Sequence, residues 1–195
     1  EAVWSDGHPF TAGDFVFVWL KNPQDYTLHK HIAGDGPWAN QYAWTSSSCG
    51  MDAAKPYALE WAVQVQSVNG NRITLKQPLR FDVRAHWSPQ VRAMGDTIRD
   101  CGIENMTIHL LRDYQWTHAK HNLEPGWNGP YFNCAINCFA RGLTIVDCDS
   151  AMIAASCKNM TCTDFSIESS RKERNDHHHG VYTIRRSQDI LFEKF

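Results

Sequence analysis

The sequence predicts an all-β protein in which the second half winds as a solenoid of short strands, preceded by a smaller and less regular β-rich segment. Two observations in the second half predict this fold. A short strand motif recurs there, with polar insertions placed between the copies. No run in that half has the length and periodicity of an amphipathic helix that could connect the strands of an α/β sheet. Short strands repeated with insertions between them are typical of solenoids.

The composition permits a folded core and excludes some classes of function. The chain has 195 residues, of which 43% are hydrophobic and 21% charged, and its formal net charge is -2. This hydrophobic content is that of a globular domain rather than a disordered chain. A net charge near zero provides no general attraction to nucleic acid or to an anionic membrane. The longest apolar run, 15–20, has the length of a strand and is far shorter than the ~20 residues of a membrane-spanning helix.

The two ends of the sequence are those expected of a piece of a longer chain. Residues 1–6 have neither the basic nor the apolar region of a signal peptide. Either a signal peptide has been removed or the chain continues before residue 1. The last residues, 190–195, alternate like a strand with no polar cap behind them, which favours the second explanation.

Residues 1–90 form the predicted N-terminal segment. Strands are expected at 15–20, at 61–68 and at 72–75, where apolar residues cluster or alternate with polar ones. The residues at 69–71 are Asn-Gly-Asn, the sequence of a hairpin turn. Residues 33–57 are rich in Gly, Ser, Trp and Pro, and this stretch is too long for a turn, so we expect a packed loop.

Residues 91–195 carry the repeat. A small or turn-forming residue precedes a β-rich pair four times, at 105–108, 142–145, 159–162 and 189–192. A second strand-like run precedes three of these, beginning at Gly129, Ser150 and Gly180. The interval after Ser150 is the longer one, and it contains a polar insertion. An irregular all-β domain without a true repeat is the alternative interpretation.

Cysteines and glycosylation motifs favour an oxidising compartment. The chain has seven cysteines, and none has the Cys-x-x-Cys or Cys/His spacing typical of structural zinc. Two Asn-x-Thr motifs make Asn105 and Asn159 predicted glycosylation sites. Together these features favour secretion to the extracellular space or the cell surface over the cytosol. Because seven is odd, one thiol is expected to be free or to pair outside this chain.

Two segments resemble single coils of right-handed parallel β-helix proteins, the pectate-lyase-like or pectin-lyase-like superfamily that includes polygalacturonases and phage tailspikes. They are 101–108, CGIENMTI, and 138–145, CFARGLTI; the hairpin at 61–79 resembles the segment before the first coil. The resemblance covers roughly two thirds of the chain. It implies a right-handed parallel β-helix over 91–195, preceded by the small irregular β-rich segment 1–90. These motifs are specific to the fold and much less so to a reaction.

In such a fold Cys101 and Cys138 would occupy equivalent positions, because each lies four residues before the motif residue, Asn105 or Gly142. Equivalent positions on neighbouring coils are ~4.8 Å apart, within reach of a disulfide bond. The pair is therefore the best candidate for a disulfide. A ladder of buried free thiols is an equally good interpretation, since cysteine packs well as a small apolar residue.

Two polar clusters are the predicted site. One spans 116–127 and the other 171–179, and each precedes a strand of the repeat at a similar place. On a right-handed coil, loops at equivalent positions emerge on the same side, so the two clusters would line one groove. The candidate catalytic residues are His118, Lys120, His121, Glu124, Asp176, His177, His178 and His179, and the candidate substrate-binding residues are Trp116, Trp127, Arg171 and Arg174.

Three chemistries fit these residues. Imidazole and carboxylate groups could bind a divalent metal, although no particular cofactor is indicated. In a lyase, Lys120, Arg171 or Arg174 would remove the proton beside a uronic-acid carboxyl group, and neighbouring cations would stabilise the developing charge. A glycosidase would need two carboxylates, from Glu124, Asp147, Asp149 and Asp176. The chain has no Asn-Thr-Asp or Asp-Asp motif of the polygalacturonase kind, which argues against that type of glycosidase.

The same residues also have structural interpretations. A His-rich loop is often an exposed polar segment, and carboxylates near a turn, such as Asp147 and Asp149, are more often solvated or capping side chains. Trp116 and Trp127 fit a sugar-stacking platform and a lid over the core equally well.

Two hypotheses of function follow. The first is a secreted pectate-lyase-like protein that acts on or binds polysaccharide, as a polysaccharide lyase or glycoside hydrolase if it is an enzyme. The second is a non-catalytic extracellular structural or glycan-binding glycoprotein module. The expected partner is a glycan, with no nucleic acid and no membrane span, and the chain is expected to be part of a larger chain or assembly.

Overall fold

A computed structural model describes residues 10–34, 58–80, 82–111, 128–170, 180–184 and 186–195. Strands form 58% of these residues and helices 7%, so the predicted all-β class is confirmed. The chain divides into two compact units, Glu1–Met94 and Gly95–Phe195. The boundary expected from the sequence, after residue 90, falls within the last strand of the first unit, Gln90–Ala93.

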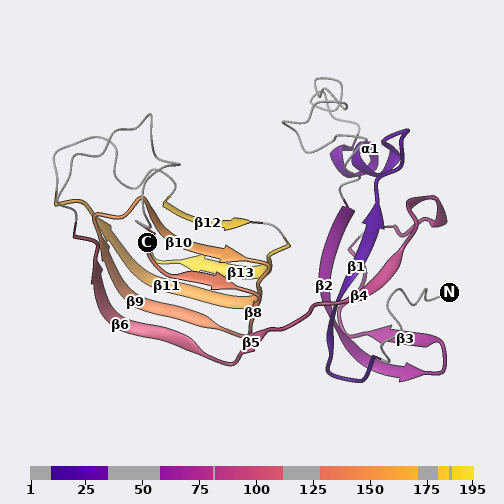
Figure 1. Ribbon diagram of the computed structural model, residues 1–195, viewed down its shortest axis with the longest axis horizontal. Coiled ribbons are helices and arrows are strands. Elements are labelled where there is room, and N and C mark those ends of the chain that lie inside the picture. Colours follow the sequence, from indigo (N-terminus) through magenta and orange to yellow (C-terminus); the bar gives the residue numbers. More distant parts are fainter. Residues whose placement is uncertain (1–9, 35–57, 81, 112–127, 171–179, 185) are drawn as a thin grey trace. The chain divides into compact units, whose positions relative to one another are not determined.

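The first unit is built on an antiparallel sheet of four strands, which Figure 1 shows in the order β3–β2–β1–β4. The strands are β1 (Phe15–Lys21), β2 (Ala58–Asn69), β3 (Arg72–Leu75) and β4 (Gln90–Ala93). The strands predicted at 15–20 and 72–75 are present, and the one at 61–68 lies within β2. Gly70 joins β2 to β3 with a φ of 55°, the left-handed conformation that a tight hairpin turn requires.

Two short helices of the first unit were not expected from the sequence. They are α1 (Thr27–Ala33) and the 3-10 helix η3 (Ala85–Trp87). Leu28 is the buried residue of α1, and it packs with Leu20 and Trp87 in a small apolar cluster that Leu59 joins. One buried residue leaves no helical periodicity to detect, and a helix this short is stable only when it is packed against other elements.

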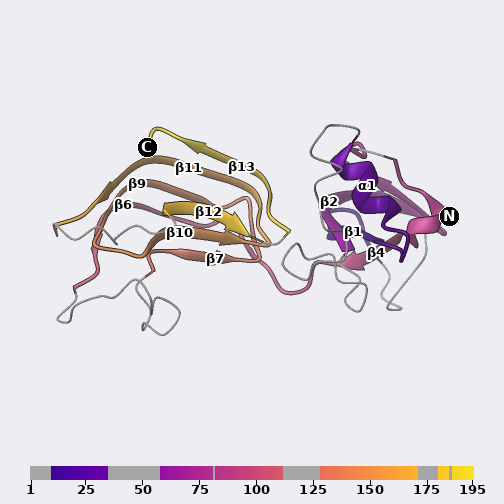
Figure 2. The ribbon, with the colours of Figure 1, turned by 90° about the horizontal axis from the view of Figure 1, so that it is seen from above.

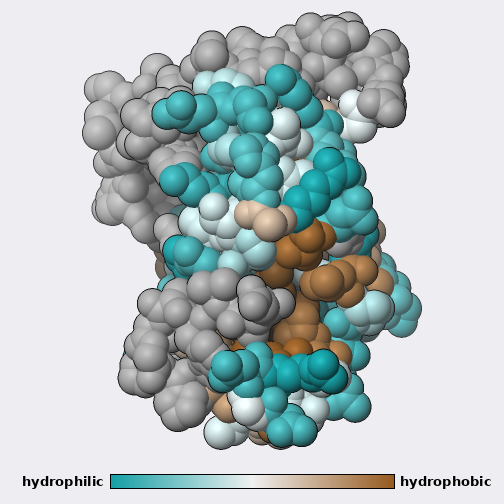
Figure 3. All heavy atoms as spheres, turned by 90° about the vertical axis from the view of Figure 1, so that its right-hand side faces the viewer, coloured by the Kyte–Doolittle hydropathy of each residue, from teal (hydrophilic) through white to brown (hydrophobic). Residues whose placement is uncertain are grey.

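One face of this sheet carries the larger core of the first unit. Val16 and Val18 of β1 pack with alternate residues of β2, which are Trp61, Val63 and Val65, and Phe10 completes the cluster. Figure 3 shows that apolar side chains gather in one patch on the face turned to the viewer, bordered by polar side chains. The partly buried apolar residues packed against this core are Val68, Ile73, Leu75 and Val91.

The second unit contains two sheets of parallel strands (Figure 2). In the smaller sheet, β10 lies between β7 and β12. The larger sheet is a curled half-barrel in which β6, β9, β11 and β13 pair in that order. The short β5 and β8 precede β6 and β9 and extend the same layer. The bounds are β5 Ile98–Arg99, β6 Gly102–His109, β7 Tyr131–Asn133, β8 Ala135–Ile136, β9 Phe139–Val146, β10 Ser150–Ala155, β11 Lys158–Glu168, β12 Gly180–Ile184 and β13 Gln188–Glu193.

The chain alternates between the two sheets of the second unit. It runs from β6 to β7, back through β8 and β9, then to β10, β11, β12 and β13. Each pass lies beside the previous one, because the strands in each sheet pair in parallel. Residues separated by one pass in sequence are therefore neighbours in space, as the repeat predicted.

The core of the second unit lies between the sheets. Every residue of β10 is buried, and alternate residues of β9 and β11 face the same interior. Strands buried on both faces need not alternate in hydropathy, which explains the continuous run Ala151–Ala155. The buried cluster comprises Phe132, Ala135, Cys138, Ala140, Leu143, Ile145, Cys148, Ala151, Met152, Ala154, Cys157, Met160, Cys162 and Phe165.

Residues in the left-handed conformation recur at equivalent points of successive passes. In one series, Asp100, Asn137, Asn159 and Asp189 have φ between 53° and 55°. The side-chain amide of Asn159 donates to Asn137 Oδ1 at 3.1 Å, and that of Asn137 donates to Asp100 Oδ1 at 3.1 Å. Asn and Asp tolerate this backbone conformation better than other residues with a side chain. The bends lie just before β6 and β9 and at the second residue of β11 and β13, and the hydrogen bonds of Asn137 and Asn159 join three of them.

A second series bends the larger sheet in mid-strand. Asn105 of β6, Gly142 of β9 and Asp164 of β11 lie between paired residues and have φ of 53°, 60° and 58°. A Cβ atom on Gly142 would lie 2.5 Å from Asn105 Oδ1, so the exposed Asn105 side chain would have to shift for any larger residue here.

These two series correct the repeat as it was aligned from the sequence. All four motif residues are left-handed, but Asn105 and Gly142 belong to the mid-strand series, whereas Asn159 and Asp189 belong to the other. The alignment of Ser150 with Gly180 is confirmed. Its alignment with Gly129 is wrong by one residue, because Asn128 forms the bridge to Ser150.

Candidate functional site

The predicted site residues of the two polar loops lie outside the described residues. This applies to the candidate catalytic residues His118, Lys120, His121, Glu124, Asp176, His177, His178 and His179 and to the candidate substrate-binding residues Trp116, Trp127, Arg171 and Arg174. Their roles stay predictions. The described residues on either side of each loop show where the loops begin and end.

Both loops begin and end beside the same turn. Val146, the last residue of β9, lies opposite His109 of β6 and Glu168 of β11. Ser150, the first residue of β10, lies opposite Asn128 and Gly180. Neighbouring strands are ~4.8 Å apart. The ends of both loops therefore flank the turn between β9 and β10, at the left edge of the larger sheet in Figure 1.

That turn holds a cluster of polar side chains centred on Asp147, here called the Asp147 cluster (His109, Asp147 and Ser170). The Nε2–H group of His109 donates to Asp147 Oδ2 at 2.8 Å. The Ser170 hydroxyl donates to the same oxygen at 2.6 Å, and the Ser170 backbone N–H donates to Asp147 Oδ1 at 2.8 Å. The cluster therefore connects the last residue of β6, the turn, and the residue before the second loop.

The backbone places the Asp147 side chain for this role. Asp147 has a φ of 60°, which turns its side chain out of the strand direction, and its backbone N–H donates to Glu168 O at 2.9 Å. The side chain is 7% exposed, whereas that of His109 is 44% exposed. A buried carboxylate needs hydrogen-bond donors, and the three donors from His109 and Ser170 supply them.

The geometry defines what the cluster can do chemically. Because Asp147 accepts a hydrogen bond from Nε2–H, the Nδ1 atom of His109 is left as the proton acceptor of a neutral imidazole. The Ser170 hydroxyl donates to Asp147 and not to His109, so the cluster lacks the nucleophile–base contact of a Ser-His-Asp triad. Its chemical capacity is a positioned imidazole at the edge where both loops arise.

The two carboxylates of the turn, Asp147 and Asp149, were expected to be solvated or capping side chains. Asp147 is buried and acts as a cap for Ser170, which fits the capping alternative. Asp149 is half-buried. Sequence reasoning missed His109 and Ser170. The available signal was position, because His109 ends a motif strand and Ser170 directly precedes the second polar loop.

The predicted glycosylation sites lie on strands. Asn105 and Asn159 are both exposed, and both have the left-handed conformation. The side chain of Asn159 donates to Asn137, as described above. A glycosylated asparagine keeps one N–H on its amide nitrogen, so this hydrogen bond is compatible with a glycan.

The predicted disulfide partners are neighbours and carry free thiols. Cys101 and Cys138 immediately precede the paired residues Gly102 and Phe139, and their Sγ atoms lie 3.7 Å apart. That is longer than the ~2.05 Å of a disulfide bond. The prediction that these cysteines are neighbours is confirmed, whereas the bond itself stays a prediction.

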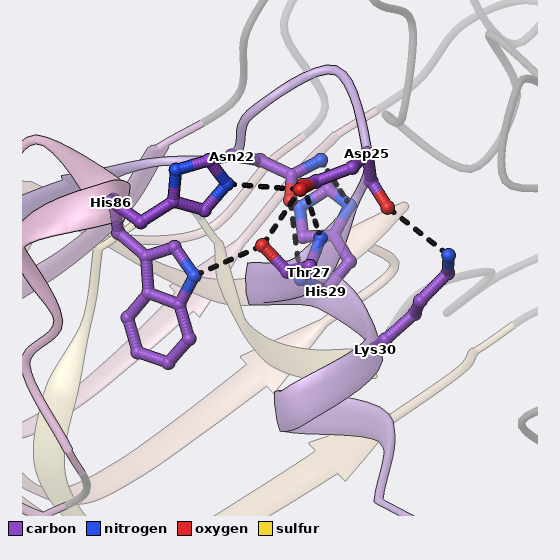
Figure 4. Close-up of polar contacts among 7 residues, drawn as sticks. Asn22, Asp25, Thr27, His29, Lys30 and His86 are labelled. Carbon is purple, nitrogen blue, oxygen red and sulfur yellow. Dashed lines mark hydrogen bonds and ion pairs between the residues drawn. The ribbon is translucent and has the colours of Figure 1, made fainter.

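The first unit has a second polar cluster that sequence reasoning also missed (Figure 4). The Nε2–H group of His86 donates to Asp25 Oδ2 at 2.9 Å, and the backbone N–H and hydroxyl of Thr27 donate to Asp25 Oδ1 at 3.1 and 2.9 Å. The indole N–H of Trp87 donates to the Thr27 hydroxyl at 3.2 Å. These bonds hold η3 against the first turn of α1.

Beside this cluster, Asn22 forms two hydrogen bonds with His29. The Asn22 amide donates to His29 Nδ1, and the His29 backbone N–H donates to Asn22 Oδ1, both at 3.2 Å. Burial lowers the pKa of His29, which favours the neutral ring that can accept this bond. The role of both contacts is structural: they attach α1 to the sheet.

The described residues contain no group of three or more His, Cys, Asp or Glu side chains arranged to hold a metal ion. Because the predicted metal-binding residues lie outside the described residues, the expectation of a divalent metal is untested. No helix in the described part of the chain is long and apolar enough to cross a membrane.

Fold and site together define an all-β protein whose second unit stacks parallel strands, and there the described residues that flank two polar loops lie beside one turn. Comparison with protein-family models, with curated proteins and with solved structures finds no match to the chain.

Proposed function

We propose that the chain is a secreted, pectate-lyase-like protein of the right-handed parallel β-helix class that binds or acts on polysaccharide at the edge around Asp147. The observation that carries this proposal is the common origin of the two polar loops. Both arise on strands that flank the β9–β10 turn. A sugar chain makes contacts over several residues, and the residue types of the two loops, which are imidazole, carboxylate, cationic and aromatic, suit such contacts.

His109 is the described residue best placed to act in this site. Its ring is oriented by a buried carboxylate and remains partly exposed at the edge. Orientation by a hydrogen-bonded carboxylate is the usual way in which proteins set the tautomer of a functional histidine. In a lyase reaction, a base must remove the proton beside a uronic-acid carboxyl group. His109 joins Lys120, Arg171 and Arg174 as a candidate for that role.

The Asp147 cluster also supports the alternative, a non-catalytic glycan-binding or structural module. Both oxygens of Asp147 accept hydrogen bonds from residues next to the loops. Asp147 is therefore better suited to hold the loop ends than to transfer a proton. A loop scaffold of this kind serves binding as well as it serves catalysis.

Incubation with polygalacturonate, a polymer of uronic acid, tests both alternatives. A lyase releases an unsaturated product that absorbs ultraviolet light. A binding module yields no such product, but the polymer slows its migration in affinity electrophoresis. We expect His109→Gln to lower turnover or retention at least tenfold. The control is His86→Gln, which removes an exposed, carboxylate-bonded histidine from the first unit. Adding a chelator tests the divalent metal separately. If the wild-type chain neither binds nor cleaves any uronic-acid or neutral polysaccharide, the proposal is wrong.

Expression through a eukaryotic secretory pathway tests the proposed location. We expect an N-glycosidase to increase the mobility of the wild-type protein, and Thr107→Ala and Thr161→Ala each to remove one glycan. A fully unmodified product would contradict secretion as a glycoprotein.

A further inference from the structure

The thiols of Cys101 and Cys138 are in contact where β6 and β9 begin. Each precedes a strand, β6 or β9, and the backbone N–H of Phe139 donates to Cys101 O at 3.1 Å. Cross-strand pairing thus holds the two residues side by side, with a Sγ–Sγ distance of 3.7 Å. Neighbouring strands at ~4.8 Å lie within the Cα separation that disulfides span.

The two thiols differ in access to solvent. Cys101 is exposed, whereas Cys138 is 2% exposed and belongs to the core. Burial raises the pKa of Cys138, so its thiol is the less reactive of the two towards a reagent in solution. Once Cys101 has reacted, Cys138 remains within reach of its sulfur. Two-step disulfide exchange needs an accessible thiol to react first and a second thiol within reach of its sulfur, and this pair supplies both.

The other described cysteines are differently placed. Cys148, Cys157 and Cys162 are buried, and the Cys157 thiol contacts the backbone carbonyls of Phe132 and Ala155 at 3.4 and 3.3 Å. Cys134 is half-buried, and its thiol contacts the side chain of its own neighbour, Asn133.

We propose that Cys101 and Cys138 are a redox-modification site, a dithiol that closes to a disulfide by exchange with a low-molecular-weight disulfide such as oxidised glutathione. The Cys101 thiolate attacks one sulfur of the oxidant, which forms a mixed disulfide and releases one glutathione thiolate. The Cys138 thiolate then attacks Cys101 Sγ and displaces the second glutathione thiolate. Two protein thiols are oxidised and one glutathione disulfide is reduced to two glutathione molecules, which take up the two protons.

The bond would secure the start of β6, the strand that ends at His109 in the proposed site. Within the described residues β6 pairs with β9, and most of its side chains are exposed. A strand held on one side opens locally more easily than a central one. Cys101 lies before the first residue of β6, and His109 is its last residue. Closure of the disulfide would therefore restrict the opening of the strand that carries His109. The site does not depend on the proposed polysaccharide activity, because the thiol chemistry is independent of any glycan.

The test is oxidation of the full chain with a graded ratio of oxidised to reduced glutathione, followed by acid quenching and non-reducing peptide mapping. We expect one cross-link between the peptides of Cys101 and Cys138, reversed by added reduced glutathione. Cys138→Ser should stop at a glutathione adduct on Cys101. Cys101→Ser should give no cross-link. Circular dichroism checks that each variant is folded.

Cys134→Ser is the matched control, because it removes the other partly accessible thiol and should leave the cross-link unchanged. A cross-link that involves Cys134 instead, or a wild-type protein that accumulates the Cys101 adduct without closing, would overturn the proposal.

Discussion

The buried ammonium group of Lys158 donates a hydrogen bond to Asp189 on the next pass of the chain. Lys158 begins β11 and is fully buried, whereas the Asp189 side chain is 30% exposed. Asp189 also has the left-handed conformation of its series. This ion pair therefore joins β11 and β13 at the bend where the stacked side chains lie.

The Lys158–Asp189 pair predicts unequal effects of removing either partner. Asp189→Ala leaves a buried charge without its partner, and breaking a buried ion pair in this way costs ~3–5 kcal/mol. We expect a loss at the lower end of that range, because Asp189 is partly exposed. Lys158→Met replaces the charge by an apolar side chain of similar length and should cost less than half as much. Urea unfolding measures both.

The exposed pair between Lys194 and Asp164, at 3.7 Å, is the control for this comparison. Asp164→Asn should change the free energy of unfolding by no more than ~1 kcal/mol. Equal losses of unfolding free energy for Asp189→Ala and Lys158→Met would show that leaving the Lys158 charge without Asp189 has no extra cost.

Gly142→Ala should destabilise the protein for two separable reasons. The residue has a φ of 60°, which costs a residue with a side chain ~1–2 kcal/mol, and its Cβ atom would press on Asn105 Oδ1. Gly70→Ala has a similar φ of 55° and open space around the new Cβ atom, so it measures the backbone cost alone. Thermal unfolding of both variants should therefore show the larger loss for Gly142→Ala.

A second substitution checks the contact. Asn105→Ala should cost less in the Gly142→Ala background than in the wild-type chain, since it removes the atom that the new methyl group meets. If the loss of unfolding free energy in the double variant equals the sum of the losses in the two single variants, the contact with Asn105 contributes nothing to the cost of Gly142→Ala.

The pKa of Asp25 should depend on His86. Hydrogen bonds from the side chain of His86 and the backbone of Thr27 lower the pKa of Asp25 below its ordinary value of 3.8. A lowered carboxyl pKa means that the stabilisation is present above the ordinary pKa and is lost as the pH falls through the folded-state value. His86→Gln should move the Asp25 pKa back toward 3.8 in an NMR titration.

His31→Gln is the control for the Asp25 titration, because His31 lies beside Trp87 with ring centroids 5.1 Å apart. It should leave the Asp25 pKa unchanged. An unaltered Asp25 pKa in His86→Gln would mean that Thr27 alone sets it.

The thiol of Cys162 should resist alkylation at alkaline pH. Burial raises its pKa from 9.0 to about 12, because the thiolate is disfavoured in the apolar core. The unfolded chain deprotonates near 9.0 while the folded chain stays neutral, so this group destabilises the fold as the pH rises from 9 toward 12. At pH 9, iodoacetamide should modify Cys101 much faster than Cys162 in the native protein, as measured by peptide mapping. Similar rates would show that the core opens more readily than its packing indicates.

Much of the second unit was predictable because left-handed bends leave a local signal. Asn105, Gly142, Asn159 and Asp189 were recognised as turn-forming residues before β-rich pairs, and all four have positive φ. The residue types that tolerate this conformation are few, so one sequence is enough to find them. Their assignment to a single series was wrong, because they belong to two series. A local signal does not specify which residues of neighbouring strands lie opposite each other.

The candidate site was predictable in position but not in composition. The polar loops were found by their residue types, and their ends do flank one turn. His109, Asp147 and Ser170 come from three separate passes of the chain, and nothing in their local sequence connects them. The same holds for His86 and Asp25 in the first unit, which meet only because η3 and α1 pack on the same buried residues.

The amino-acid sequence by itself determined the strand-forming runs and the left-handed bends. Those features depend on backbone preference and on alternation along one segment, which each segment carries within itself. Tertiary structure alone decided which strands stand side by side, and with them the contact of His109 with Asp147 and of Lys158 with Asp189. The physical reason is that backbone hydrogen bonds between parallel strands are the same for every pairing. The choice among registers is made by the whole buried core, which forms only when all the passes are stacked.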